Sequence, residues 1–177
     1  MKKSDAKFAL IAYVARSVGE ISVLGKKALQ KVVHLASEIS GADFGYEFRL
    51  YTYGPFSREL ASDVDVMDSI GLVAVNFNPT RNGYEISAKP EASTLIEVFI
   101  EEYPEEKENI DKIISIFGNR LAKDLELSSM LTFILTRKLV TDTSDDDSVV
   151  SKFLEIKPHY RELDVKNGLK EIRELLN

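Results

Sequence analysis

The sequence predicts an α+β protein that is mostly helical. Apolar residues recur at helical spacing over most of the chain, while residues 73–88 alternate apolar and polar side chains around a turn-rich loop. The 177 residues are 44% apolar and 29% charged, which is an ordinary globular composition. A chain of this length can bury a sizeable core without disulfide bonds, and it contains no cysteine.

The first two helices are marked by apolar repeats and by glycines. Residues 8–18 are apolar on nearly every side, which predicts a central helix that ends near Gly19. The β-branched stretch at residues 20–25 predicts a small strand or an extended turn. A second helix is expected from Gly25 to Gly41, with Lys27, Lys31, His34 and Glu38 on an exposed face opposite its apolar stripe.

An aromatic stretch separates the second helix from the third. Residues 46–54, "YEFRLYTYG", alternate and predict a strand, of whose aromatic side chains about half are expected in the core. Gly54 and Pro55 turn the chain, and Ser57 is a natural N-cap for a helix. Gly71 stands where the end of that helix requires a left-handed residue.

The remaining elements are a β-hairpin and a set of helices. Residues 73–77 and 84–88 form two alternating runs joined by the turn-forming "NPTRNG". Apolar stripes then predict two helices separated by Pro104 and a third, near residues 125–140, that is apolar almost all round. A polar loop leads to a short helix near residues 149–154 and to a last helix over residues 165–176.

This order of elements predicts a winged helix-turn-helix-like core with a β-hairpin wing. Helix, short strand, helix, helix and hairpin occupy residues 1–90, and residues 91–177 form a helical C-terminal subdomain packed on that core. The strand between the second and third helices departs from the standard pattern, in which only a short turn stands there.

The chain resembles the YwgA-like family and, more distantly, the Panacea domain of SocA-type antitoxins. The residues that carry the resemblance are "KKALQKVVHLA" at 26–36 and "RLYTYGPFSRELASDVDVMDSIGLV" at 49–73, with "LELSSMLTFI" and "KPHYRELDVKNGLKEIREL" in the C-terminal half. The resemblance covers most of the chain and implies no catalytic residue. The Panacea link implies a regulatory module that engages other proteins.

The net charge of −6 is unevenly distributed along the chain. Residues 1–40 hold seven Lys or Arg against three acids, whereas residues 91–177 hold twelve against nineteen. An acidic total argues against a protein that holds long nucleic acids by phosphate neutralisation alone, but it leaves room for a local basic patch.

The third helix supplies the candidate protein-interaction residues Glu59, Asp63 and Asp65. A helix that reads DNA needs donors for base edges and cations for phosphates, and these acids would repel the backbone. An acidic face can instead dock a basic partner. The alternative is that acids near a helix start only complement its dipole.

Candidate nucleic-acid contacts are Lys26, Lys27 and Lys31 at the start of the second helix, and Arg81 in the hairpin loop. Cations at a helix N-terminus oppose its dipole, which hints at another purpose such as a phosphate or acidic-partner contact. A solvated helix face and an ordinary loop arginine are the alternatives.

No pattern in the chain points to catalysis. There is no nucleophile motif, phosphate loop or metal spacing, and zero Cys with two His disfavours zinc. We therefore expect no enzyme activity, catalytic residue, cofactor, metal or small-molecule ligand. The run Asp145, Asp146 and Asp147 lacks the spacing of a calcium loop and is expected at a helix start.

The N-terminal segment, basic and then apolar, fits a helix better than a signal peptide, and no run approaches the length of a membrane span. We expect a cytoplasmic protein with no membrane partner.

Two functions remain open. The first is a non-enzymatic regulatory module, antitoxin-like or adaptor-like, that binds a protein partner or itself. The second is a transcription regulator that contacts DNA phosphates through its basic N-terminal region.

Overall fold

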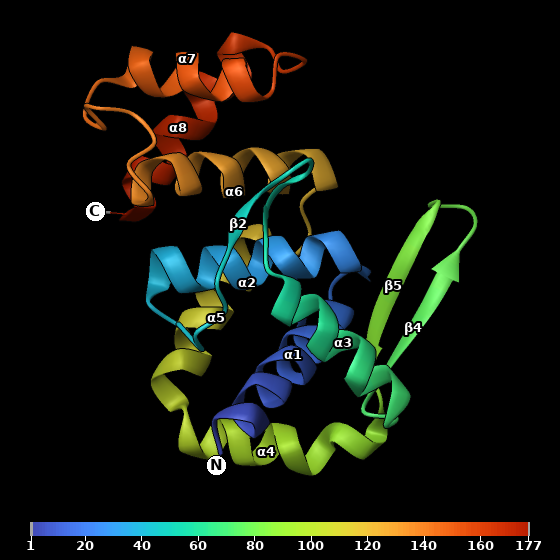
Figure 1. Cartoon of the computed structure of the whole chain (residues 1–177). Coiled ribbons are helices and arrows are strands. Elements are labelled where there is room, and N and C mark those ends of the chain that lie inside the picture. The colour runs from blue at the N-terminus through green and yellow to red at the C-terminus, as the bar shows by residue number, and fades with distance from the viewer. Residues whose placement is uncertain (1, 177) are drawn as a thin grey trace.

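The computed structural model describes residues 2–176, without the side chain of Lys3, and shows an α+β chain that is mostly helical. This confirms the predicted class (Figure 1). The elements are, in chain order, α1 (Lys3–Gly19), β1 (Leu24–Gly25), α2 (Lys26–Ser40), β2 (Arg49–Tyr51), β3 (Gly54–Phe56), α3 (Arg58–Ser69), β4 (Val73–Asn78), β5 (Gly83–Ala88), the 3-10 turn η1 (Pro90–Ala92), α4 (Ser93–Glu102), α5 (Pro104–Phe117), α6 (Ala122–Thr136), α7 (Asp146–Ile156) and α8 (Glu162–Leu176).

Helix α1 lies at the centre of the N-terminal half. Its residues from Ala9 to Ala15 are all buried, as its apolar character on every side predicts. It contacts α3, α4 and α5, so it links the first helices to those that follow the β4–β5 hairpin. In Figure 1, α4 lies at one end of the molecule and α7 and α8 lie at the other.

Two small antiparallel sheets accompany the helices. One has the strand order β1-β5-β4 and pairs Leu24 and Val75 with Ile86, which confirms the predicted hairpin. The other is the β2–β3 hairpin, in which Leu50 pairs with Pro55. The strand expected over residues 46–54 is shorter: the chain reverses after Tyr51, so residues 49–51 form β2 and Gly54 already belongs to the returning strand β3.

Helix α2 is covered on more than one side. It contacts α5, α6 and β3, and every residue from Leu29 to Ala36 is buried. The prediction that Lys31 and His34 lie on an exposed face is therefore wrong: Lys31 is 4% exposed and His34 is fully buried. The apolar stripe of α2 shows which of its faces is buried, but it cannot show that α6 (residues 122–136) also covers the opposite, polar face.

The helices of the C-terminal half follow the predicted order. Helix α6 is buried on nearly all sides, and α8 approaches it closely at Gly168, where an added Cβ would lie 3.0 Å from Leu127 Cδ2. Arg120 forms a two-pronged ion pair with Glu171 of α8, with one contact of 2.8 Å. None of the helices in the described residues combines the length and apolar character that crossing a membrane requires.

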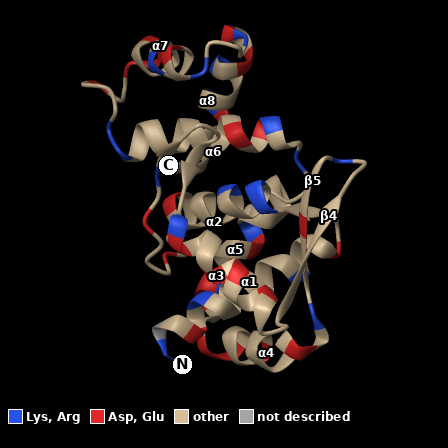
Figure 2. Ribbon diagram, turned by 45° about the vertical axis from the view of Figure 1, so that its right-hand side comes forward, with Lys and Arg blue, Asp and Glu red and all other residues tan. Residues whose placement is uncertain are grey.

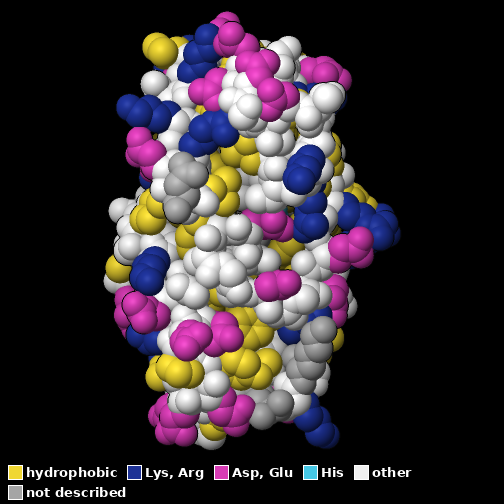
Figure 3. Space-filling model, turned by 90° about the vertical axis from the view of Figure 1, so that its left-hand side faces the viewer, with side chains coloured by type: hydrophobic (Ala, Val, Ile, Leu, Met, Phe, Trp, Pro, Cys, Tyr) yellow, Lys and Arg dark blue, Asp and Glu magenta, His cyan; other side chains and the backbone are white. Residues whose placement is uncertain are grey.

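Two predicted helix starts are confirmed by their caps. The Ser57 hydroxyl accepts a hydrogen bond from the Leu60 N–H at 3.3 Å, and the Asp145 carboxylate accepts one from the Asp147 N–H at 3.2 Å. The acidic run at 145–147 thus begins α7, where the helix dipole favours negative charge. Figure 3 shows the face turned away from the β4–β5 hairpin, where acidic and basic side chains are interspersed.

Candidate functional site

A cavity of about 410 Å³ lies where the first turns of α2 meet the β2–β3 hairpin, α3 and β5. Leu29, Val64 and Ile86 supply apolar side chains from three different elements. Tyr51, Tyr53 and Phe56 of the β2–β3 hairpin supply aromatic ones. We call this cavity and the two hairpins that border it the hairpin cleft. Its size and apolar lining suit a ligand or a partner's side chains.

The aromatic wall of the cleft belongs to the β2–β3 hairpin. The rings of Tyr51 and Phe56 lie 5.4 Å apart between centroids, and the Arg58 Nε donates to the Tyr51 hydroxyl at 2.7 Å. Tyr51 and Tyr53 are 42% and 56% exposed, so their rings face solvent as well as the cavity. Their exposure leaves apolar surface that a bound partner can cover.

Helix α2 holds the base of this hairpin by three hydrogen bonds. The Gln30 amide donates to the Ser57 carbonyl at 3.0 Å and accepts from the Ser57 N–H at 2.9 Å. The Lys31 Nζ donates to the Pro55 carbonyl at 2.7 Å. These bonds satisfy buried backbone groups and fix the position of the wall.

The C-terminal half holds the hairpin from the other side. The amine of Lys157, which follows α7, donates to the Thr52 carbonyl and pairs with Glu126 of α6. Both side chains of this pair are largely buried, at 8% and 17% exposure. The turn of the hairpin is thereby tied to residues more than a hundred positions later in the chain.

Lys31 is a buried amine beside the cavity. Its pKa is lowered to about 8, mainly by burial; the Glu126 carboxylate opposes the shift, and the charges of Lys157 and Lys27 add to it. The amine therefore carries its proton through most of the physiological range and loses it under mildly basic conditions.

The opposite wall continues along the β4–β5 hairpin. Side chains on one face of a strand repeat every second residue, so Tyr84 shares the face of Ile86, and its cross-strand neighbour Phe77 shares it too. The rings of Phe77 and Tyr84 lie 5.3 Å apart between centroids and are 52% and 55% exposed. An apolar surface thus extends outward from the cavity.

Two lysines at the start of α2 stand between the walls. The Lys27 Nζ lies 3.6 Å from the centroid of the Tyr53 ring, and the Lys26 Nζ lies 5.7 Å from that of Tyr84. Figure 2 shows blue, basic segments of α2 toward the end that is nearest to the β4–β5 hairpin. Lys26 also pairs with Asp65 at 2.6 Å. Among the described residues, Lys27 makes no ion pair.

The structure thus brings together three of the four predicted nucleic-acid contacts. Lys26, Lys27 and Lys31 all line the cavity, although the Lys31 amine faces inward. Arg81 does not line it, and its guanidinium lies 3.7 Å from the Glu85 carboxylate in the hairpin.

Each of the three acidic candidates on α3 has a partner within the molecule. Glu59 pairs with Lys7 at 2.6 Å, Asp63 accepts from the Tyr46 hydroxyl at 2.7 Å, and Asp65 pairs with Lys26. Burial and the Asp63 hydrogen bond raise the pKa of Tyr46. Glu59 and Asp65 stay exposed, but the amines of Lys7 and Lys26 offset their charges.

His34 lies inside the core, away from the cleft. Its Nδ1 is 3.0 Å from the Ser129 hydroxyl, and the Phe48 ring packs at 4.9 Å between centroids. Within the described residues its Nε2 has no hydrogen-bond partner. Burial, with smaller effects of Lys31 and Arg137, lowers the pKa of His34 to about 3, so the ring is neutral.

The sequence did not reveal the cavity itself, because its lining spans residues 26 to 86 on separate elements. The features of the sequence that pointed toward it were the aromatic stretch, half of which was expected outside the core, and the Gly54-Pro55 turn.

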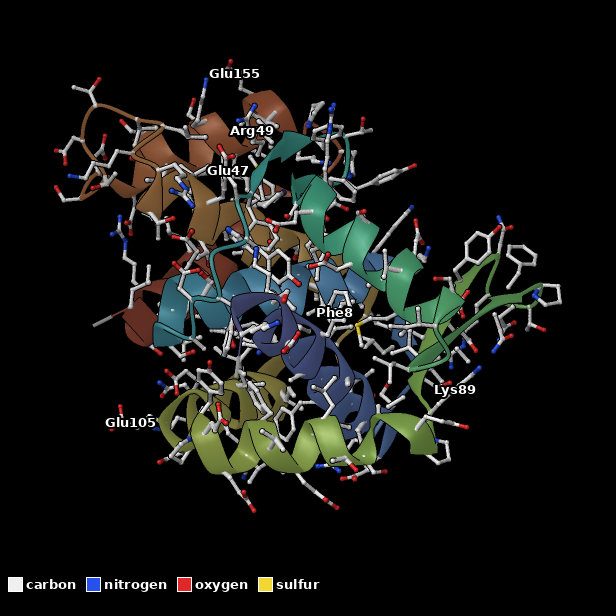
Figure 4. The ribbon with its side chains drawn as sticks, turned by 60° about the horizontal axis from the view of Figure 1, so that its bottom comes forward. Phe8, Glu47, Arg49, Lys89, Glu105 and Glu155 are labelled. Atoms are coloured by element: carbon white, nitrogen blue, oxygen red, sulfur yellow. The ribbon has the colours of Figure 1, made fainter. Side chains whose placement is uncertain are left out.

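The β2–β3 hairpin also has a polar edge. Glu47, just before β2, and Arg49, the first residue of β2, lie side by side in Figure 4, and the Arg49 guanidinium donates a hydrogen bond of 3.0 Å to the Glu47 carboxylate. Among the described residues, no three acidic or imidazole side chains gather as a metal site would require.

In comparisons with known proteins, no family model and no curated protein sequence matches the chain.

Proposed function

We propose that the protein is a non-enzymatic regulatory module, antitoxin-like or adaptor-like, that binds a protein partner in the hairpin cleft. The observation that carries the proposal is the apolar cavity with the exposed aromatic rings Tyr51 and Tyr53 in its wall. Tyrosine is one of the residue types enriched among those that contribute most to protein–protein binding, once a partner buries them.

A winged-helix-like core is part of this proposal. The order α1, β1, α2, α3 and the three-stranded sheet β1-β5-β4 support it. The β2–β3 hairpin inserted before α3 adds a wall that a simple turn would not supply. The more distant resemblance to the Panacea domain supports a regulatory role for such a core.

The charges favour a protein over DNA as the partner. Helix α3, which would enter a groove of DNA, carries four acids and a single cation of its own, Arg58. Lys7 and Lys26 only offset Glu59 and Asp65, so the helix offers phosphates no excess of positive charge. Lys26 and Arg81 already lie beside carboxylates of the same chain. The DNA-binding regulator remains the second candidate, because Lys26 and Lys27 do come together at the start of α2.

A capture experiment with extract of the source cells tests the proposal. The immobilised full chain is compared with Tyr53→Asp, which places a charge in the aromatic wall, and with Leu163→Asp as a matched control. Tyr53 and Leu163 are 56% and 66% exposed, so both variants are expected to fold. We expect the same partner with the wild type and the control and at least a tenfold loss with Tyr53→Asp, because replacing a wall aromatic costs more than 1.4 kcal/mol of binding free energy.

If all three proteins capture the partner equally well, the cleft is not the binding site.

Labelled duplex DNA, titrated at about 50 and about 200 mM salt, tests the second candidate function, the DNA-binding regulator. Binding that weakens steeply with salt and is lost in Lys27→Glu/Arg81→Glu would favour the regulator. Lys31 is left unchanged because a buried substitution would disturb the fold.

A further inference from the structure

We propose that the hairpin cleft recognises a peptide segment in which a large apolar side chain, preferably aromatic, stands next to a carboxylate. This inference rests on the proposed function, because it specifies the chemistry of the partner that the same cleft binds. The occupant is a segment of another protein, and the argument concerns size, charge and the extent of the apolar surface.

The size of the cavity fits one or two side chains. A volume of about 410 Å³ is at the lower end of the range for ligand sites and exceeds that of a single aromatic side chain. Leu29, Val64 and Ile86 give apolar contacts, and Phe56 offers a ring for stacking or edge-to-face packing. The cavity therefore favours an apolar anchor over a polar one.

The charge at the cavity is positive. Of the residues that the structure describes, three lysines and no acidic residue line it. Asp65 compensates Lys26, and Lys31 bonds to the Pro55 carbonyl, whereas Lys27 lies over the Tyr53 ring and makes no ion pair with any described residue. Lys27 is thus the cation available to an incoming carboxylate.

The start of α2 adds to this positive charge. Gly25 gives no side-chain cap, and the first turn of the helix holds no acid. A carboxylate that approaches Lys27 also approaches the positive end of the helix dipole. Lys27, Tyr53 and Ile86 line the same cavity, so an aromatic group next to that carboxylate can enter it.

The apolar surface outside the cavity indicates a peptide, which can extend farther than a compact small molecule. Phe77 and Tyr84 continue the wall along the β4–β5 hairpin and are about half exposed. Residues that flank the anchor can cover these rings, as the side chains of a bound segment do in grooves with several subsites.

Selection from a phage-displayed library of random dodecapeptides on the immobilised full chain tests the inference. We expect enriched peptides that carry Phe, Tyr, Trp or Leu within two positions of Asp or Glu. The strongest peptide is then synthesised with a fluorescent label, and its Kd is measured by polarisation for the wild type and for variants.

Lys27→Glu is the decisive variant, with Lys112→Glu as its control. Both reverse one exposed lysine charge, but Lys112 lies on α5, outside the cleft. An acid in the first turn of α2 suits the helix dipole, so Lys27→Glu is not expected to weaken the fold. We expect Lys27→Glu and Tyr53→Ala each to weaken binding at least tenfold, and Lys112→Glu to change it less than twofold.

Enrichment of basic or acid-free peptides, no enrichment over an unrelated protein, or a Kd unaffected by Lys27→Glu would each overturn the inference. If the Tyr53-dependent partner is captured while the library gives none of the expected peptides, the proposed function stands and the peptide chemistry is wrong. If capture itself is independent of Tyr53, the proposed function fails first.

Discussion

At the scale of single residues, burial decides what the charged and polar side chains can do. Lys31 is four positions from the exposed Lys27, yet Lys31 and His34 both lie inside because α6 covers the side of α2 that periodicity marks as polar. Their identity was visible in the sequence, but their environment was not, since the covering helix comes about ninety residues later.

His34 predicts how stability depends on pH. Its pKa is about 3 when folded and about 6.5 when unfolded, so between these values only the unfolded chain takes up the proton. Stability is therefore lost as the pH falls below 6.5. Between pH 7 and pH 5 we expect His34 to lower the free energy of unfolding by about 2 kcal/mol.

Urea unfolding at pH 7 and pH 5 measures this effect. The change with pH should shrink by about that amount, ~2 kcal/mol, in His34→Leu and stay as in the wild type in His159→Leu, whose histidine is exposed. Equal changes in both variants would mean that His34 is not buried as a neutral ring.

At the scale of elements, local patterns predicted the helices and the β4–β5 hairpin because each depends on neighbours along the chain. Ser57 and Asp145 begin their helices as expected, and Pro104 separates α4 from α5. The β2–β3 hairpin was not predicted, since aromatic alternation over residues 46–54 does not distinguish one long strand from a short strand with a return. Tyr46 and Phe48 are buried without joining a ladder.

The β2–β3 hairpin depends on Lys157. Lys157→Met removes the donor to Thr52 and leaves the Glu126 carboxylate without its cation, which should cost about 3 kcal/mol of unfolding free energy. Amide exchange at residues 49–56 should become faster. Adding Glu126→Gln should recover part of the loss, because no unpaired charge is then buried. A loss below about 1 kcal/mol with unchanged exchange would contradict this role.

At the scale of the whole molecule, the C-terminal helices do more than pack on the N-terminal half. Helices α5 and α6 contact α2, and Lys157 and Glu126 hold the turn that carries Tyr53 next to the cavity. The lining of the cavity lies within residues 26–86, and the C-terminal helices support one of its walls from behind. This lining could not be predicted, because it requires α2, β2, β3, α3 and β5 to meet in space, which no local pattern encodes.

Deuterium exchange of the full chain, alone and saturated with the captured partner, tests the central claim most directly. Binding in the hairpin cleft predicts slower exchange in residues 24–31, 49–56 and 83–88, which form its walls, and unchanged exchange in α7 and α8. Slowing that is confined to the outer face of α3 or to α6, α7 and α8, with the cleft segments unaffected, would contradict the account.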